Sequence, residues 1–225
     1  MYLNTRIKKN IAKKKNNTYA FNTAKYWIKG KKNAMKQAKT LTAPEIRRVL
    51  DYIATRKYAA RNRAMLLMTH LAGMRVGEVA SLRYRDVINT DHTVRAEILL
   101  SAEQTKGNEA RTVYINERLR KELTTYIQSQ RFSTHPRTKL FGTQKRQIDG
   151  FSANSLAQYF HHLYKGAGIA GASSHSGRRS FITNLAGKGV GVRVIMGLSG
   201  HRALSSVQHY IDCSDDMKRR AVELV

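Results

Sequence analysis

The opening stretch of the chain limits where a folded core can form. Residues 1–44 contain twelve lysines and arginines and no aspartate or glutamate, and the first carboxylate is Glu45. The lysines lie among Asn, Thr and scattered aromatic residues, a composition more typical of a solvated or disordered arm than of a folded module. We therefore expect a basic arm over residues 1–40, partly disordered without a bound partner, and a folded domain over residues 41–225.

The charge of the whole chain favours a polyanionic partner. The 225 residues include 41 Lys+Arg and 15 Asp+Glu, which gives a formal net charge of +26. Each Lys or Arg that lies against a phosphate releases a condensed counterion, so an excess of basic residues strengthens binding to nucleic acid. A ribosomal or RNA-coating protein and a membrane-surface binder would fit the charge alone equally well. The arm residues that we expect on a nucleic-acid backbone are Lys13, Lys14, Lys15, Lys31 and Lys32.

Cysteine usage and hydropathy indicate a soluble cytoplasmic protein with no membrane partner. The single cysteine, Cys213, excludes an intramolecular disulfide and argues against a cysteine-based zinc site. No stretch approaches the ~20 apolar residues that span a bilayer. The N-terminus also lacks the apolar core of a secretory signal, because Lys and Asn interrupt it throughout.

Apolar periodicity predicts a mainly helical domain. Thr42, Pro44 and Glu45 form a capping-box signature, and apolar residues follow at helical spacing as far as Ile53. The same spacing predicts further helices over residues 62–72, 76–82, 117–130 and 152–165.

Two segments rich in Val, Ile and Leu predict strands. They cover residues 94–100 and 111–115, and the polar segment 101–110 supplies the turn between them. The expected fold class is therefore mainly α with a small antiparallel β-sheet.

A helical stretch that begins at His175 has an unusual buried face. Ser174 can cap this helix. On a 3.6-residue period, His175 and Arg178 share a face with Ile182 and Leu185, so the apolar stripe also carries a guanidinium. A buried charge without a partner is costly, so we expect an anion or a carboxylate opposite Arg178. Taken alone, an ordinary arginine–carboxylate pair at a helix start explains this stretch.

Other segments carry polar residues of a related kind. Arg75 opens a short helix, and Glu78 can hold it from the same face three residues later. Lys106 lies on the hairpin turn, His201 follows a glycine, and Tyr210 comes nine residues after that histidine. Each has an ordinary explanation as a capped helix, a turn lysine, a surface histidine or a buried tyrosine. Their combined order and spacing are much harder to explain in that way.

The combined pattern resembles the active-site signature of the tyrosine recombinases, the phage-integrase family. The likeness covers roughly residues 41–215. The residues that carry it are Arg75, Lys106, His175, Arg178, His201 and Tyr210.

The resemblance implies strand cleavage and rejoining in double-stranded DNA at a specific recombination site. Tyr210 would be the nucleophile, forming a 3′-phosphotyrosyl link and releasing a 5′-hydroxyl. Arg75 and Arg178 would clamp the non-bridging oxygens of the phosphate, and His201 would donate a further hydrogen bond.

The remaining roles concern proton transfer. His175 is the candidate general base for the phenol, and Lys106 would act as the general acid on the departing 5′-oxygen. No metal and no cofactor are expected, because cationic side chains replace the metal and the covalent link conserves the bond energy.

Some positions depart from the family pattern. Arg179 stands where the family often has His and is expected to face DNA or solvent. Gly177 replaces a common Leu, which we expect to weaken helix packing slightly, and Ser199 stands where Leu or Gly is usual. Typical members also carry a separate core-binding domain of about a hundred residues, a size expected of a free-standing domain, where this chain has 40 residues.

The resemblance also implies an assembly state and a location, and two rival functions remain. We expect a homo-tetramer on DNA, a monomer or dimer when free, and a cytoplasmic, nucleoid-associated location. A short tail helix through Met217, Ala221 and Leu224 packs either on its own domain or on a neighbouring protomer. The rival functions are a type IB topoisomerase-like enzyme that relaxes DNA and a non-catalytic DNA-binding protein.

Overall fold

The computed structural model describes residues 37–130, 135–143, 148–208, 210 and 215–223. Ala38–Val225 form one compact unit. The five lysines predicted as backbone contacts in the arm lie outside the described residues, as does Leu224 of the tail, so their roles stay predictions. Among the helices that the structure describes, none is long and apolar enough to cross a membrane.

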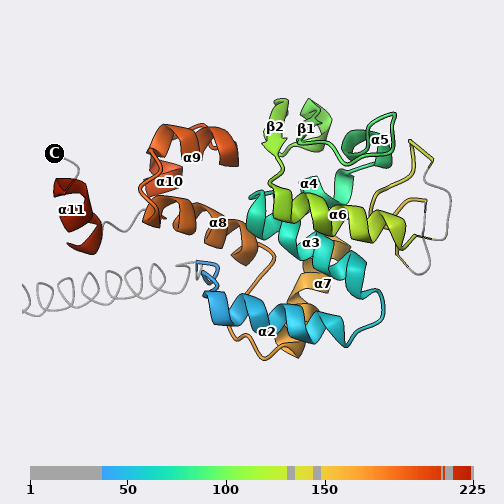
Figure 1. Ribbon diagram of the computed structural model, residues 1–225, viewed down its shortest axis with the longest axis horizontal. Helices are drawn as coiled ribbons and strands as arrows, with labels where there is room; N and C mark the ends of the chain where they lie inside the picture. Colours follow the sequence, from blue (N-terminus) through green and yellow to red (C-terminus); the bar gives the residue numbers. More distant parts are fainter. Residues whose placement is uncertain (1–36, 131–134, 144–147, 209, 211–214, 224–225) are drawn as a thin grey trace, which may run out of the picture. The chain divides into compact units, whose positions relative to one another are not determined.

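The fold is mainly helical with one small sheet, as the sequence predicts (Figure 1). Its helices are α2 (Ala43–Ala54), α3 (Ala59–Leu71), α4 (Val76–Ser81), α5 (Tyr84–Val87), α6 (Glu117–Gln128), α7 (Ala153–Gly166), α8 (Ser176–Gly187), α9 (Val192–Ser199), α10 (Ser205–Gln208) and α11 (Asp215–Val222). All four segments predicted from helical spacing form helices. The single turns α5 and α10 are too short for apolar periodicity to indicate them.

The first helix of the compact unit shows how local sequence sets an element. The Thr42 hydroxyl accepts a hydrogen bond from the Glu45 amide at 3.4 Å, and the Glu45 carboxylate accepts one from the Thr42 amide at 3.0 Å. This is the predicted capping box, with Pro44 in the first turn where its missing N–H costs nothing. The buried face of α2 consists of Ile46, Val49, Leu50 and Ile53.

The two strands form an antiparallel hairpin whose turn projects toward the site described below. Strand β1 (Glu97–Leu100) pairs with β2 (Arg111–Tyr114), and Ile98 lies opposite Val113. Both of these side chains are buried, while their neighbours along the strands point outward. The strands are shorter than predicted, and a 3-10 turn, η1 (Ala102–Gln104), begins the connection between them.

Helix α3 lies at the centre of the core. It contacts α2, α4, α6 and α8, and Figure 1 shows it between α6 and α2. Residues 64–68 are all fully buried, which suits a helix that is covered on every side. A second, smaller apolar cluster joins α8, α9 and α10 and consists of Ile182, Ala186, Ile195 and Val207.

Helix α8 approaches α3 closely at Gly177. A Cβ at this position would lie 2.1 Å from the Thr69 hydroxyl oxygen, so a larger residue does not fit without movement. The expectation that glycine weakens packing here is therefore wrong, because the glycine is what permits the close approach. The contact places the first turn of α8, with Arg178, beside the turn that leads into α4.

Candidate active site

Three arginines from distant parts of the chain converge on the carboxyl end of α9. The last carbonyl groups of a helix have no intrahelical partner and carry the negative end of its dipole, so they attract cations. Each arginine donates to a different one of three consecutive carbonyl oxygens. The pairs are Arg111 to Leu198 at 3.0 Å, Arg178 to Ser199, and Arg75 to Gly200 at 3.1 Å.

The end of α9 owes its shape to a glycine in the left-handed conformation. Gly200 has φ of 63°, which L-residues with a Cβ adopt at a cost. The Gly200 amide donates to the Gly197 carbonyl at 3.3 Å, and the His201 amide donates to the Met196 carbonyl at 3.1 Å. This Schellman arrangement turns the chain back on itself, so His201 lies against the end of its own helix.

Glu78 fixes two of the three arginines. Its fully buried carboxylate accepts hydrogen bonds from the Arg75 guanidinium at 2.8 Å and the Arg111 guanidinium at 2.6 Å. Burial alone raises the pKa of Glu78, but the hydrogen bonds and charge of Arg111, with those of Arg75, outweigh it and lower the pKa. The carboxylate is therefore ionised at neutral pH and holds Arg75, as the sequence predicts.

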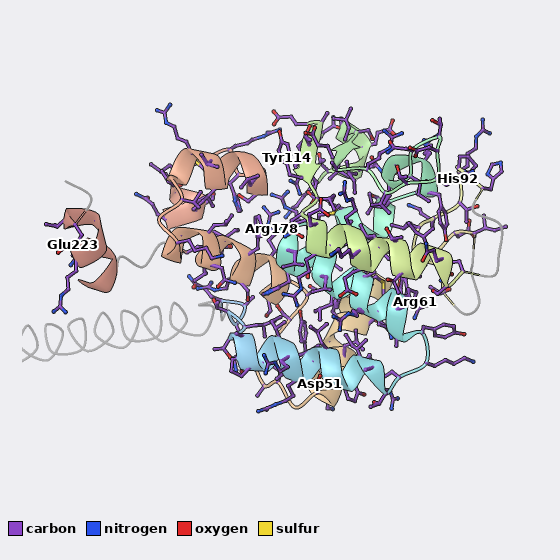
Figure 2. All side chains as sticks on the ribbon, viewed as in Figure 1. Asp51, Arg61, His92, Tyr114, Arg178 and Glu223 are labelled. Atoms are coloured by element: carbon purple, nitrogen blue, oxygen red, sulfur yellow. The ribbon has the colours of Figure 1, made fainter. Side chains whose placement is uncertain are left out.

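Arg178 lies in the first turn of α8, where its side chain is buried; Figure 2 labels it. Its guanidinium donates to the Gly73 carbonyl at 2.6 Å and to the Ser199 carbonyl. Burial, followed by the charge of Arg75, lowers the pKa of Arg178 to about 9, so the group is still charged at neutral pH. The hydrogen bonds of Arg178 that the structure describes go to uncharged carbonyl oxygens. The expected carboxylate opposite Arg178 is therefore wrong, and the expected anion stays a prediction.

The two histidines of the site both favour the neutral form. Burial and the charges of Arg178, Arg75 and Arg111 lower the pKa of His201 to about 4. Partial burial and the charges of Arg178, Lys106 and Arg75 also lower the pKa of His175. Both imidazoles therefore have an unprotonated nitrogen at neutral pH.

His175 itself occupies the capping position of α8, which begins at Ser176. The predicted cap by Ser174 is wrong, because α8 has no side-chain capping hydrogen bond. The Ser174 hydroxyl instead lies 3.3 Å from Nδ1 of His175.

A cavity of about 500 Å³ joins the hairpin turn to the end of α9. Its lining includes Arg75, Lys106, Arg111 and His201. Lys106 is exposed on the turn, and its long side chain lines the cavity from that side. The cavity therefore brings together cationic groups from both ends of the domain's sequence.

Tyr210 lies next to these groups in the same chain. Its ring centroid is 6.1 Å from that of His201, and its ring packs against the cluster that contains Ile182. The Arg179 guanidinium lies over the Tyr210 ring at 5.1 Å and donates to the Thr40 hydroxyl at 2.9 Å. The structure places Arg179 half-buried over the tyrosine ring, and its expected contact with DNA stays a prediction.

The structure thus gathers the residues that the sequence singles out, and it adds others. Arg111 was recognised only as a strand position, although its place two residues before the buried Val113 indicates an inward-facing side chain. Ser199 was noted only as a departure from the residues usual at that position. Arg202 carried no signal in the sequence, because its contacts with Glu109 and Gly107 depend on how the segment after α9 meets the hairpin turn.

Comparison with known proteins identifies the family. The family model described as "Phage integrase family" matches residues 39–217. Tyrosine recombinase XerA of Thermococcus kodakarensis is 31% identical over 186 residues, which cover 82% of this chain and 62% of that protein. Transposase A from transposon Tn554 of Staphylococcus aureus is 25% identical over 190 residues, covering 81% of this chain and 51% of that protein.

Solved structures share the fold. A crystal structure of XerA recombinase matches with a TM-score of 0.65 at 23% identity, covering 85% of this chain and 65% of that chain. The Tn1549 transposon integrase in complex with circular intermediate DNA matches with a TM-score of 0.64 at 18% identity, covering 84% and 68%. The chain spans about three fifths of the length of the XerA proteins that it matches. It belongs to the phage integrase family and contains a tyrosine recombinase catalytic domain.

Proposed function

We propose that this protein is a site-specific DNA recombinase that cleaves and rejoins double-stranded DNA through Tyr210. The observation that carries the proposal is the meeting of Arg75, Arg178 and His201 at the end of α9, beside the ring of Tyr210. Three cationic or hydrogen-bonding groups around one tyrosine suit a phosphodiester better than an apolar or neutral substrate. Family membership supports the same reaction.

The proposed reaction exchanges one phosphoester bond for another. The Tyr210 oxygen attacks the scissile phosphorus, a 3′-phosphotyrosyl bond forms, and the bond to the 5′-oxygen breaks. Negative charge grows on the non-bridging oxygens, where Arg75 and Arg178 stabilise it with planar guanidinium groups. Rejoining is the reverse reaction with a 5′-hydroxyl as the attacking group. No nucleotide cofactor is required, because the energy of the broken bond is kept in the new one.

Two protons must move in this reaction. A phenol must lose its proton to become a good nucleophile, so Tyr210 needs a base to attack at neutral pH. His175 fits that role because its lowered pKa leaves a free lone pair. Lys106 lines the cavity from the hairpin turn and would donate the second proton to the departing 5′-oxygen.

The partners proposed are a specific recombination site in double-stranded DNA and further copies of this chain. A homo-tetramer would assemble on DNA from free monomers or dimers in the cytoplasm, in association with the nucleoid. Residues 1–40 would act as a basic arm on the DNA backbone, and residues 41–225 would be the catalytic domain. The arm's lysines would add sequence-independent affinity to this complex.

A suicide-substrate assay tests the proposal. Duplexes that cover the DNA flanking the gene, each nicked so that the cleaved end diffuses away, are incubated with the wild type, Tyr210→Phe and Tyr114→Phe. Tyr114 is an exposed tyrosine on β2 and serves as the matched control. We expect a denaturation-resistant adduct with the wild type and Tyr114→Phe and none with Tyr210→Phe.

The adduct assay, together with plasmid relaxation and DNA binding, distinguishes the proposed function from its rivals. An adduct that survives in Tyr210→Phe would refute the assigned nucleophile. Relaxation of a supercoiled plasmid that lacks any cleaved duplex sequence would indicate a topoisomerase-like enzyme instead. DNA binding without any adduct on any duplex would indicate a non-catalytic DNA-binding protein.

A further inference from the structure

Ser199 forms a buried hydrogen-bonded chain with His201. It is the last residue of α9, and its side chain is fully buried. Its hydroxyl oxygen lies 2.6 Å from the Ile195 carbonyl and 2.7 Å from Nδ1 of His201. On the other side of the imidazole, Nε2 lies 3.4 Å from Nη2 of Arg178. The chain therefore runs from a guanidinium, through the imidazole and the hydroxyl, to a carbonyl.

The two ends of this chain determine where its protons lie. A guanidinium can only donate a hydrogen bond, and a carbonyl oxygen can only accept one. Arg178 therefore points an N–H at Nε2, and the Ser199 hydroxyl gives its proton to the Ile195 carbonyl. The contact between Ser199 and Nδ1 then needs a proton from the imidazole. A neutral imidazole has one N–H, and it must be on Nδ1.

The opposite assignment fails at both ends. A proton on Nε2 would point at the cationic Arg178. The serine would then have to donate to Nδ1, which would leave two oxygen lone pairs facing each other at 2.6 Å between Ser199 and Ile195. Each defect is an unsatisfied or repulsive contact in a buried place, so together they exclude this tautomer.

We propose that Ser199 is a positioning residue that holds His201 in the Nδ1–H tautomer, with Nε2 unprotonated and facing the phosphate-binding arginines. The catalytic meaning of this arrangement rests on the proposed function.

The tautomer has a consequence for phosphate binding. His201 can donate from Nε2 to a phosphate oxygen only after a second proton arrives from solvent. The charged and titratable groups around the ring belong to α8, the turn before α4, α4 itself, β2, the hairpin turn and the segment after α10. They are Arg178, Arg75, Glu78, Arg111, Lys106 and Tyr210. Cations outnumber Glu78 in this set, so the ring is neutral without DNA, and an arriving phosphate favours the second proton.

Nuclear magnetic resonance tests the tautomer without DNA. The full chain is labelled with ¹⁵N-histidine, and long-range proton–nitrogen correlations are recorded near pH 7, where the protonated and unprotonated ring nitrogens differ in chemical shift. The chain has eight histidines, so the spectrum of His201→Gln identifies the signals of His201. We expect the Nδ1–H pattern in the wild type.

Two substitutions at position 199 separate positioning from packing. Ser199→Thr keeps a hydroxyl and should keep the Nδ1–H pattern, whereas Ser199→Ala should shift His201 toward Nε2–H. An Nε2–H pattern in the wild type, or an unchanged pattern in Ser199→Ala, would overturn the proposal. The wild-type spectrum decides the tautomer even where a variant fails to fold. The NMR measurements need no DNA cleavage. Failure of the recombinase proposal would therefore be detected separately, in the adduct assay.

Discussion

Arg202 pairs with Glu109 across the edge of the cavity, and their sequence positions differ by 93 residues. The guanidinium lies 2.9 Å from one carboxylate oxygen and 2.7 Å from the other. The same guanidinium donates to the Gly107 carbonyl at 2.6 Å. Arg202 follows His201 and Gly107 follows Lys106, so this pair ties the turn that carries the candidate acid to the loop that carries the candidate phosphate ligand.

Loss of the pair between Arg202 and Glu109 should slow DNA cleavage with little effect on the free energy of unfolding. In Glu109→Ala the turn loses its anchor, and misplacement of Lys106 by an ångström or so should lower the single-turnover cleavage rate by roughly ten- to a hundredfold. Both side chains are more than half exposed, so the free energy of unfolding should change by less than about 1 kcal/mol. The control Glu117→Ala removes an exposed pair with Arg120 on α6. Equal cleavage rates in both variants would show that the pair does not position the turn.

Glu78 should matter for stability more than any exposed carboxylate. Glu78→Gln removes the charge that Arg75 and Arg111 share, and it leaves two partly buried guanidinium groups without their common carboxylate. We expect the free energy of unfolding to fall by about 3 kcal/mol, as for other broken buried ion pairs. Chemical denaturation measures it, with Glu117→Gln as a control that should change stability by less than about 0.5 kcal/mol. A similar effect of the two substitutions would mean that the carboxylate at position 78 is dispensable.

Gly177 should resist even the smallest side chain. Gly177→Ala places a Cβ against Thr69, and we expect a loss of about 1–3 kcal/mol from overpacking. At Gly197 in α9 a Cβ meets nothing within 4 Å, so Gly197→Ala should instead stabilise the protein by up to about 1 kcal/mol. Thermal denaturation measures both. Adding Thr69→Ala to Gly177→Ala should recover part of the loss, and a strictly additive double variant would argue against a direct clash.

His70 should make the protein sensitive to mild acid. Its Nδ1 is buried with no hydrogen-bond partner among the described residues, and burial with the charge of Arg118 lowers its pKa to about 4. The unfolded chain binds this proton below pH ~6.5 and the folded chain only below about 4, so the contribution is present at neutral pH and is lost as the pH falls through that window. Between pH 7 and pH 5 this one group should cost roughly 2 kcal/mol of stability.

Comparing unfolding at the two pH values checks that expectation. His70→Leu should show a smaller loss between pH 7 and pH 5 than the wild type. An identical loss would mean that His70 is protonated as readily in the folded chain as in the unfolded one. His201 shares the depressed pKa, so the remaining loss in His70→Leu should shrink again in the double variant with His201→Gln.

The basic arm gives a prediction about salt. Deleting residues 1–40 should weaken DNA binding and flatten its dependence on salt concentration, because fewer counterions are released on binding. The compact unit begins at Ala38, so the catalytic fold should persist in the shortened chain. Binding isotherms at several salt concentrations, with circular dichroism as the control for folding, provide the measurement. An unchanged salt slope would rule out the arm as a DNA contact.

Local signals in the sequence predicted the main helices and strands well. The features they did not predict are contacts between residues far apart in the sequence. The cap at Thr42 and the polar turn that carries Lys106 are set by nearby residues, so the sequence alone located them. The partner of Arg178 could not be predicted in the same way. A buried guanidinium needs acceptors of some kind, but only the tertiary fold brings the carbonyl oxygens at the end of α9 to it.

The same limit applies to Ser199. A serine at the end of a helix is usually a surface or capping residue, and nothing in its neighbours along the chain indicates a buried contact with an imidazole. That contact exists because Gly200 turns the backbone so that His201 folds back on the helix. The residues that the fold brings together could be singled out from the sequence, whereas the groups that orient them depended on the fold.

The gathering of three arginines at the end of α9 has a thermodynamic consequence. Carbonyl dipoles and the Glu78 carboxylate only partly offset three positive charges that lie this close together, so repulsion remains among the three arginines. Any oxyanion that binds between them relieves this repulsion and should raise the melting temperature, even without recognition of a base sequence. Under the proposed function, a DNA phosphate would supply the negative charge that the folded domain lacks at this point.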